Sequence, residues 1–480
     1  MVNTRRILIA ANRLPVTVVT TDGTVGLHPS SGGLATALSR VRRQHRSLWI
    51  GWTGLPESPE PVTRRIIDSQ LDAEGMRAVH LSRGEVAGFY RRYANEMLWP
   101  VLHDMTPHDD GVGAWQMYRN VNVKFADAIV RELRPSDLVW VHDYHLMLVP
   151  RLVRQQCPWA RIGFFLHTPF PAVSSFANVG QATALLDGLL GADVIGVHTR
   201  EHACNFVEAL HSILRRPTHD DVVRDLGRDI RIFSCPIGVD NVALGRLGAD
   251  PDVVAAAQDL RGDGLLFAGV DRLDYTKGIP QRLRAFEQLL DNEPGLVGRA
   301  RLLQVAVPSR EDVGGYRRLR GEVEALVSRI NARWARLNWK PIDYRFENLS
   351  TTTLAALYRA ADVMLVTPLR DGMNLVAKEF VATRTDGDGM LVLSKGAGAA
   401  AELSTALLVE PRNERALTDA CIAALNMLRG ERRVRMRRLR SIVAGHDVFR
   451  WADRNLSVLL AQRPSIHHNV PLMRSTLASS

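Results

Sequence analysis

Short apolar runs of about five residues recur along this chain and alternate with longer segments of helical periodicity. The first two runs are Ile7 to Ala11 and Ser47 to Trp52. Continuous apolar runs of this length are typical of parallel strands that are buried on both faces. Four more follow, at Asp137 to Val141, Arg161 to Leu166, Asp193 to Val197 and Ile230 to Ser234. Strands that alternate with helices in this way predict a doubly wound parallel sheet.

The same alternation restarts after a polar linker at Gly245 to Asp252. Its apolar runs are Leu265 to Val270, Arg301 to Val307, Ile342 to Phe346, Val363 to Val366, Met390 to Ser394 and Leu407 to Val409. We therefore predict an α/β protein with two Rossmann-like domains that face a central cleft, at residues 1–242 and 243–445. Residues 446–480 are expected to form a helix that packs back on the first domain, followed by a loose tail.

Polar residues follow several predicted strands directly, where parallel sheets bind their ligands. Arg13 follows the first strand, while Asp143 and His167 follow two later ones. In the second domain, Arg272 and Lys277 follow a strand in the same way. These positions suit chemistry, although a single His at a strand end is as often structural.

The stretch Val366 to Phe380 turns from a strand through Asp371-Gly372 into a helix that opens near Asn374. A helix entered in this way presents N–H groups without intrahelical partners and the positive end of its dipole. Such an end binds phosphate or another anion. The alternative is an ordinary strand-to-helix turn in which Asp371 is the N-cap.

Cations and a carboxylate flank this predicted anion site. Lys277 is one of only five lysines among 61 basic residues, and its compact ammonium suits a phosphate. Glu379, further into the helix, can accept hydrogen bonds from both hydroxyls of a ribose. Neither domain carries GxGxxG after its first strand, which disfavours dinucleotide oxidation. The combination favours a nucleotide diphosphate and glycosyl transfer.

Composition adds little to this picture but excludes other classes. A net charge of +10 invites nucleic-acid binding, yet the basic residues are spread along the chain and no RNA-binding or zinc spacing is present. The four cysteines lack CxxC spacing, which favours buried thiols in a reducing compartment. No apolar run is long enough for a signal peptide or a membrane span. We expect a cytoplasmic protein with no nucleic-acid or membrane partner.

Several longer motifs together resemble the trehalose-6-phosphate synthase family, glycosyltransferase family 20. They are VTPLRDGMNLVAKEF, VDRLDYTKG, VHDYH, GFFLHTPFP, YRRYANEMLWP and the Gly32-Gly33 loop after NRLP. The resemblance covers roughly Arg6 to Leu460 in the same order. It implies the GT-B fold and a retaining glucosyltransferase that uses UDP- or GDP-glucose and glucose 6-phosphate to make α,α-trehalose 6-phosphate. It implies neither a cofactor nor a metal, because Arg, Lys and a helix N-terminus supply the positive charge.

The resemblance also implies a role for each matching residue. On the donor side, Arg272 and Lys277 bind the diphosphate, Gly33 approaches it, and Glu379 binds the ribose. The donor glucose is held by Asp371 together with Gly372, Met373, Asn374 and Leu375. His167 contacts the donor sugar near the reacting carbon. On the acceptor side, Asp143 contacts the hydroxyls, and the phosphate and sugar are held by Arg13, Trp52, Tyr90, Trp99 and Arg310.

The chain departs from the family pattern at Arg92 to Asn95, at Ala172 to Ser175 and at His198. These departures fall in the first domain and leave other phosphorylated acceptors open, such as glycerol 3-phosphate or a pseudo-sugar phosphate. A non-catalytic sensing paralogue is a further alternative. The base of the donor, regulation and the oligomeric state, including a homo-oligomer, stay open at this point.

Overall fold

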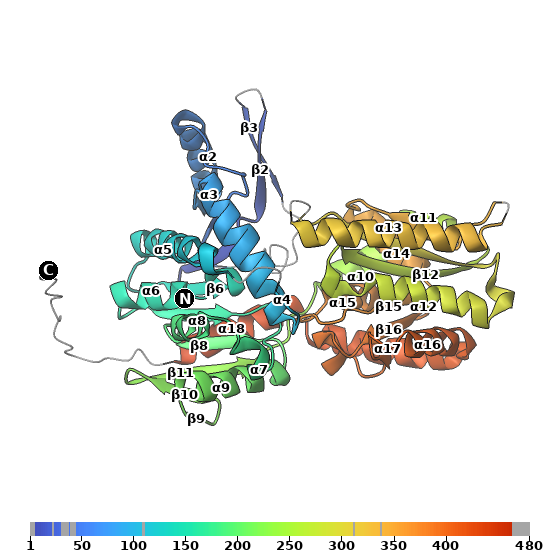
Figure 1. Cartoon of the computed structure of the whole chain (residues 1–480). Coiled ribbons are helices and arrows are strands. Elements are labelled where there is room, and N and C mark those ends of the chain that lie inside the picture. Colours follow the sequence, from blue (N-terminus) through green and yellow to red (C-terminus); the bar gives the residue numbers. More distant parts are fainter. Residues whose placement is uncertain are drawn as a thin grey trace, which may run out of the picture.

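The computed structural model describes residues 5–21, 24–29, 38, 45–107, 111–310, 313–336 and 338–462. Two α/β lobes lie side by side, each built on one large sheet with helices packed on both of its faces (Figure 1). The amino-terminal lobe holds a nine-stranded sheet and the carboxy-terminal lobe a six-stranded one.

The sheet of the amino-terminal lobe has the order β5-β4-β1-β6-β7-β8-β11-β10-β9. Its strands are β1 (Ile7–Arg13), β4 (Ser47–Trp52), β5 (Met76–Ala78), β6 (Leu138–His142), β7 (Arg161–Phe165), β8 (Val194–Val197), β9 (Thr218–His219), β10 (Val222–Asp225) and β11 (Arg228–Ser234). The strands from β5 to β11 pair in parallel, as predicted. However, β10 pairs antiparallel with β11 and β9, so the parallel sheet carries an antiparallel edge that the sequence does not predict. The reason is a two-residue turn, in which Leu226 and Gly227 both have positive φ, and such turns join antiparallel strands.

The sheet of the carboxy-terminal lobe is parallel throughout, with the order β14-β13-β12-β15-β16-β17. Its strands are β12 (Leu265–Arg272), β13 (Ala300–Val307), β14 (Ile342–Arg345), β15 (Val363–Val366), β16 (Met390–Ser394) and β17 (Leu407–Val409). Their carboxyl ends face the other lobe, which places Arg272 and the turn after β15 at the boundary between the lobes.

Helices fill the connections between the strands. Those of the first lobe are α2 (Pro61–Ala73), α3 (Arg83–Glu85), η1 (Val86–Leu98), α4 (Trp99–Leu102), η2 (Val112–Ala114), α5 (Trp115–Glu132), η3 (Tyr144–Leu146), α6 (Val149–Gln156), α7 (Val173–Phe176), α8 (Ala182–Leu189) and α9 (Arg200–Leu214). Those of the second part are α10 (Asn241–Ala249), α11 (Pro251–Arg261), η4 (Tyr275–Lys277), α12 (Ile279–Asn292), η5 (Pro294–Leu296), α13 (Gly314–Trp334), α14 (Thr351–Ala360), α15 (Leu375–Thr383), η6 (Gly398–Ala401), α16 (Glu414–Asn426), α17 (Arg429–Gly445) and α18 (Val448–Ala461).

A hairpin of β2 (Val16–Thr21) and β3 (Thr24–Pro29) projects from the first lobe (Figure 1). The two strands pair antiparallel over their whole length and do not join the main sheet. The sequence predicts only turns here, because neither strand carries the continuous apolar run of a buried strand.

The chain crosses between the lobes twice, and the two crossings touch. The Val448 amide donates to the Val239 carbonyl at 3.3 Å. A Cβ atom at Gly238 would lie 1.9 Å from the carbonyl oxygen of His446, so only glycine allows this approach. A buried lysine, Lys378, also donates to the Ile237 carbonyl at 2.7 Å. The crossings therefore form one joint.

Beyond the second crossing, α18 returns to the amino-terminal lobe, where its red ribbon lies among blue and green elements (Figure 1). Its Trp451 ring lies 5.3 Å from Trp140 of β6 and 5.1 Å from Phe165 of β7. The helix is thus a structural part of the first lobe. The tail expected after it, from residue 463, lies outside the described residues.

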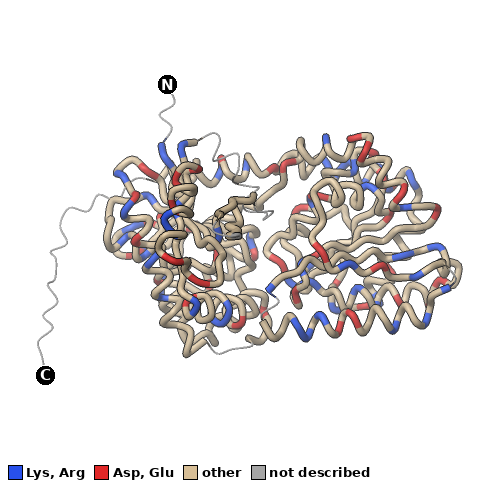
Figure 2. The backbone as a smooth tube through the Cα atoms, turned by 90° about the horizontal axis from the view of Figure 1, so that it is seen from above, with Lys and Arg blue, Asp and Glu red and all other residues tan. Residues whose placement is uncertain are grey.

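Along the backbone, positions of basic and acidic residues are interspersed in both lobes (Figure 2). In the described part of the chain, no helix has the length and apolar character needed to cross a membrane. All four cysteines are free thiols, and Cys157, Cys235 and Cys421 are buried. Cys204 is exposed on α9, so the expectation of four buried thiols was wrong there.

Candidate active site

A cavity of about 350 Å³ lies between the lobes, at the carboxyl ends of the strands. It brings together many of the residues singled out in the sequence, namely Arg13, Tyr90, Trp99, Asp143, His167, Arg272, Arg310, Asp371 and Gly372. Trp52, Lys277, Met373, Asn374, Leu375 and Glu379 do not line this cavity. Gly33 lies outside the described residues.

The turn after β15 is held by an ion pair between Asp371 and Lys277. The Lys277 ammonium is buried and lies 2.5 Å from Asp371 Oδ2, which also accepts from the Asn374 side-chain amide at 3.1 Å. Burial raises the pKa of Asp371, but Lys277 outweighs it, and the net pKa is below the ordinary value. The reading of Asp371 as an N-cap is wrong, since its carboxylate binds these two side chains.

Helix α15 begins at Leu375, with Asn374 as the N-cap residue. Asn374 has a φ of 70°, and its side chain caps no N–H group of the helix. Because no side chain caps this end, its first N–H groups are available for an anion. Met373 is buried in the core, so only its backbone is suited to ligand contact.

The backbone of Gly372 lies close against the other lobe. A Cβ atom placed on it would lie 2.0 Å from the carbonyl oxygen of His167. Any larger residue would push the turn after β15 away from the strand end that carries His167.

Arg272, at the end of β12, is exposed toward the cleft, and its guanidinium lies 5.3 Å from the centre of the Trp99 ring. The indole of Trp99 belongs to α4 in the other lobe. The same ring also lies 4.2 Å from the guanidinium of Arg310. Trp99 therefore stands between two cations that the sequence assigns to different substrates.

Arg310 is held in a polar cage that the sequence does not predict. It donates to Tyr144 Oη of the other lobe at 3.2 Å, and to Tyr316 Oη and Asp274 Oδ2 in its own lobe. Asp274 is fully buried; burial raises its pKa, but Arg310 and Arg272 outweigh this and the net pKa lies well below its usual range. The partners of this one cation thus come from both lobes.

Arg13 ends β1 and lies with its guanidinium 4.8 Å from the centre of the Trp52 ring. The Trp52 ring in turn meets Tyr90 edge-on at 5.3 Å. Trp52 is buried behind these two side chains, so it supports the wall of the cavity and does not form it. Burial lowers the pKa of Arg13, which leaves the group charged near neutral pH.

Asp143 and His167 lie together at the ends of β6 and β7. Asp143 Oδ1 accepts from the His167 amide at 3.1 Å, and the Asp143 backbone has a positive φ of 73°. Burial raises the pKa of Asp143 to about 6, opposed by hydrogen bonds from backbone amides. Burial lowers the pKa of His167 to about 3, so its imidazole is neutral at physiological pH.

Neighbouring side chains fix the orientation of the neutral imidazole of His167. Its Nε2 lies 3.2 Å from His142 Nδ1, and the Trp451 ring of α18 is 5.8 Å away. A hydrogen bond between two neutral imidazoles requires one donor and one acceptor. His142 and Trp451 thus fix the orientation of His167, and neither is predicted from the sequence.

Glu379 lies on α15, one turn from its start and beyond the cavity between the lobes. Its Oε2 accepts from Tyr358 Oη at 2.9 Å. Burial raises the pKa of the Glu379 carboxyl, and the hydrogen bond from Tyr358 opposes this. Glu379 thus lies within the helix, as predicted, about one turn from its first residue, Leu375.

Other residues at the cavity escaped sequence reasoning. His103 lines it, with Nδ1 bound to the Trp99 carbonyl at 2.7 Å, and burial lowers its pKa to about 4. Asp274 stands between Arg272 and Lys277 in the motif VDRLDYTKG, a signal that could have revealed it. Tyr144 likewise follows Asp143 in the motif VHDYH. Tyr316 gave no comparable signal, since its role depends on contacts between distant segments.

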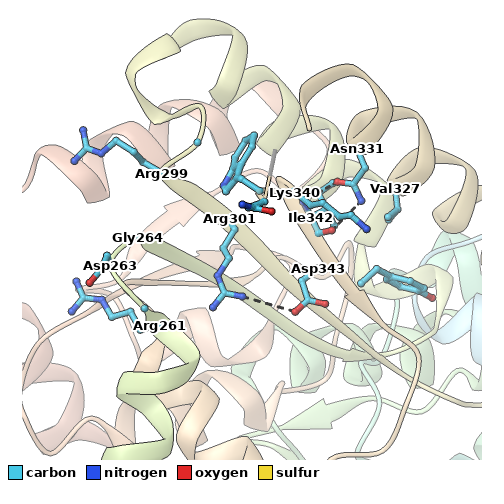
Figure 3. A pocket seen from close by; sticks show the side chains of 15 residues that line it. Arg261, Asp263, Gly264, Arg299, Arg301, Val327, Asn331, Lys340, Ile342 and Asp343 are labelled. Carbon is cyan, nitrogen blue, oxygen red and sulfur yellow. Dashed lines mark hydrogen bonds and ion pairs between the residues drawn. The ribbon is translucent and has the colours of Figure 1, made fainter. Parts of the chain in front are cut away.

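A second cavity, of about 690 Å³, lies at the opposite edge of the second sheet, where β12, β13 and β14 begin (Figure 3). Several of its charges are already compensated: Arg301 lies 4.0 Å from Asp343, and Arg261 lies 2.9 Å from Asp362. This end of a parallel sheet is not where such folds bind their substrates. We therefore place the candidate active site in the cleft. Among the residues that the structure describes, no group of three or more His, Cys, Asp or Glu could hold a metal ion.

Comparison with known proteins places this geometry in context. The profile of glycosyltransferase family 20 matches residues 5–461. The chain is 40% identical to a trehalose-6-phosphate synthase of Mycobacterium ulcerans, over 95% of this chain and 94% of that protein. It is 39% identical to a bifunctional trehalose-6-phosphate synthase/phosphatase of Thermoproteus tenax, but spans only 62% of its length. The crystal structure of a UDP-forming α,α-trehalose-phosphate synthase of Burkholderia xenovorans in complex with glucose 6-phosphate is 32% identical, with a TM-score of 0.84, over 95% of this chain and 100% of that one.

Proposed function

This chain belongs to glycosyltransferase family 20, and we propose that it transfers glucose with retention from UDP-glucose to glucose 6-phosphate. The product is α,α-trehalose 6-phosphate. The related Burkholderia enzyme is UDP-forming and binds glucose 6-phosphate, which favours UDP over GDP as the base. The phosphatase half of the Thermoproteus relative has no counterpart in this proposal.

One observation carries the proposal: a single cavity between the lobes holds Arg272 and Asp371 on one side and Arg13, Asp143 and Arg310 on the other. Two substrates that each carry phosphate need two separate sets of cations around one point of reaction. The sets are joined at Trp99, whose ring lies near both Arg272 and Arg310.

On the donor side, the diphosphate binds Arg272 and Lys277, while Asp371 beside Lys277 holds the donor glucose. Lys277 and Arg272 then stabilise the negative charge that builds on the leaving phosphate as the bond to glucose breaks. The uncapped N-terminus of α15 adds N–H groups at the same point. These groups act where charge develops, so their effect is on the transition state.

On the acceptor side, Arg13, Tyr90 and Arg310 hold the phosphate of glucose 6-phosphate, and Asp143 accepts a hydrogen bond from its sugar hydroxyls. His167 is neutral, so it positions the donor sugar and does not protonate it. The acceptor hydroxyl attacks from the side that the leaving group departs from. Its proton passes to the departing phosphate oxygen, and the configuration of the glucose carbon is retained.

We further propose that the reaction needs no metal ion, since Arg272, Lys277 and the start of α15 supply the charge that a divalent ion supplies elsewhere. The four free thiols support a reducing compartment, the cytoplasm. Nucleic acid is not among the expected partners.

A matrix of donors and acceptors tests the proposal. Purified protein is incubated with UDP-, GDP- and ADP-glucose, each with glucose 6-phosphate, and the nucleoside diphosphate and sugar product are identified with and without a chelator. We expect UDP and α,α-trehalose 6-phosphate, with rates that the chelator leaves unchanged. Absence of nucleoside diphosphate release from every pair would overturn the proposal.

A second candidate keeps the donor and replaces the acceptor by another phosphorylated compound. It is favoured by the departures from the family pattern at Arg92 to Asn95 and Ala172 to Ser175, which lie in the acceptor-side lobe. Arg13, Tyr90 and Arg310 still face one cavity, so the acceptor keeps a phosphate. Glycerol 3-phosphate and pseudo-sugar phosphates in the same matrix decide between the two candidates.

A further inference from the structure

The carboxylate of Glu379 is partly buried, and this burial raises its pKa, yet it has few hydrogen-bond partners. Its Oε2 accepts from Tyr358 Oη, while no described residue donates to its Oε1 or forms an ion pair with it. Carboxylates in sites of low polarity are normally paired with a cation or accept several hydrogen bonds. The missing donors must therefore come from solvent or from a ligand.

Tyr358 is a fixed donor. It lies on α14, its side chain is 2% exposed, and burial raises its pKa well above the ordinary value. The phenol therefore keeps its proton, and it donates this hydrogen bond to the ionised carboxylate, which can only accept. The backbone behind it is held as well, because Arg384 donates to the Tyr358 carbonyl at 3.2 Å.

A carboxylate that is held through one oxygen keeps its other oxygen, and the remaining lone pair of the first, in a defined plane. Two neighbouring hydroxyls, such as those of a ribose, can each donate a hydrogen bond to a carboxylate held in this way. We propose that Tyr358 is a positioning residue that orients Glu379 for the two ribose hydroxyls of the nucleotide. This inference rests on the proposed function, since it takes a nucleotide sugar as the donor.

The test is Tyr358→Phe, which removes the hydroxyl and keeps the ring in the core. Its matched control is Tyr344→Phe, a second tyrosine in the same lobe, whose buried hydroxyl has no hydrogen-bond partner among the described residues. We expect Tyr358→Phe to raise the KM for UDP-glucose about tenfold, as for loss of a hydrogen bond to a charged group. The kcat and the KM for glucose 6-phosphate stay within about twofold, and the control changes neither KM.

A donor that lacks both ribose hydroxyls, 2′,3′-dideoxyuridine diphosphate glucose, separates positioning from packing. With this donor the two enzymes should differ by less than about twofold, because Glu379 then has nothing to orient. An equal loss on both donors, or no loss on UDP-glucose, would overturn the inference. Calorimetric binding of UDP alone compares the wild type and Tyr358→Phe without turnover. The role of Tyr358 can therefore be tested even if the acceptor is not glucose 6-phosphate. A wild type that binds no UDP would refute the proposed function itself.

Discussion

The donor side and the acceptor side of the cleft hold their cations in different ways. On the donor side, Lys277 is paired with Asp371 at 2.5 Å, and both lie on turns of the same lobe. On the acceptor side, Arg13 and Arg310 lie over the rings of Trp52 and Trp99, at 4.8 and 4.2 Å. These two arginines belong to different lobes, since Arg13 ends β1 and Arg310 follows β13.

This difference separates two tasks. The donor cations Arg272 and Lys277 both belong to one lobe, so we expect them to bind the diphosphate whether the cleft is open or closed. The acceptor set is assembled from both lobes through the contact of Arg310 with Tyr144 Oη. Acceptor binding is therefore coupled to closure, while donor binding is not. Four changes test this comparison, from the largest expected effect to the smallest.

Arg272→Ala tests the donor set directly. Loss of a charged group that acts on the leaving phosphate should raise the barrier by about 2.7–4 kcal/mol, a fall of about 10²–10³ in kcat. The side chain is exposed, so the melting temperature should stay unchanged. Steady-state kinetics and thermal unfolding measure both effects. Arg299→Ala, on the far edge of the same sheet, is the control; an equal fall in that variant would show that the effect is not local.

Gly372→Ala tests closure. The new Cβ atom would lie 2.0 Å from the His167 carbonyl oxygen, so the donor turn and the first lobe must move apart. We expect kcat to fall about a hundredfold, as for other displacements of about 1 Å at a reacting site. The KM for glucose 6-phosphate should rise more than the KM for UDP-glucose. Gly430→Ala, where nothing lies within 4 Å, is the control, and X-ray scattering with both substrates should report a larger radius for Gly372→Ala alone.

Arg310→Lys tests the acceptor set. Lysine keeps the charge but cannot donate at once to Tyr144, Tyr316 and Asp274, and it stacks less well on Trp99. The KM for glucose 6-phosphate should rise about tenfold with the KM for UDP-glucose unchanged. A rise in both KM values would contradict the separation of the two sets.

Asp143→Asn should stabilise the protein although it removes a contact to the acceptor. Burial raises the pKa of Asp143 to about 6, above the value of about 3.9 in an unfolded chain. Its contribution to stability is therefore present below about pH 4 and is lost as the pH rises through 6. The variant should melt about 2 °C above the wild type at pH 7.5 and equal to it at pH 4, as measured by calorimetry. A lower melting temperature at pH 7.5 would refute this.

The sequence predicts the fold well where burial is two-sided. The runs from Ile7 and Leu265 are continuous and apolar, and both are central parallel strands. It fails at β2, β3 and β10, because strands that are buried on one face or on neither leave no continuous run. Here turns such as Leu226-Gly227 decide the pairing.

The residues of the candidate site also fall into two groups, those that a local motif predicts and those that only the fold brings together. Asp371 and Gly372 follow one another in one motif, so their proximity is a local property of the chain. The cage of Asp274, Tyr144 and Tyr316 around Arg310 joins segments that are up to 172 residues apart in number, and no local pattern contains it. The individual roles carried over from the family stay predictions, to which the variants above apply.

The return of α18 has a consequence for how the protein is made. Trp451 lies behind His142 and His167, yet it leaves the ribosome after the entire second lobe. The first lobe therefore waits, with an uncovered apolar face, until more than two hundred further residues have been synthesised. Chains that expose such surfaces during synthesis are prone to aggregate. A truncated chain that ends at the second crossing should need a chaperone that the full chain does not.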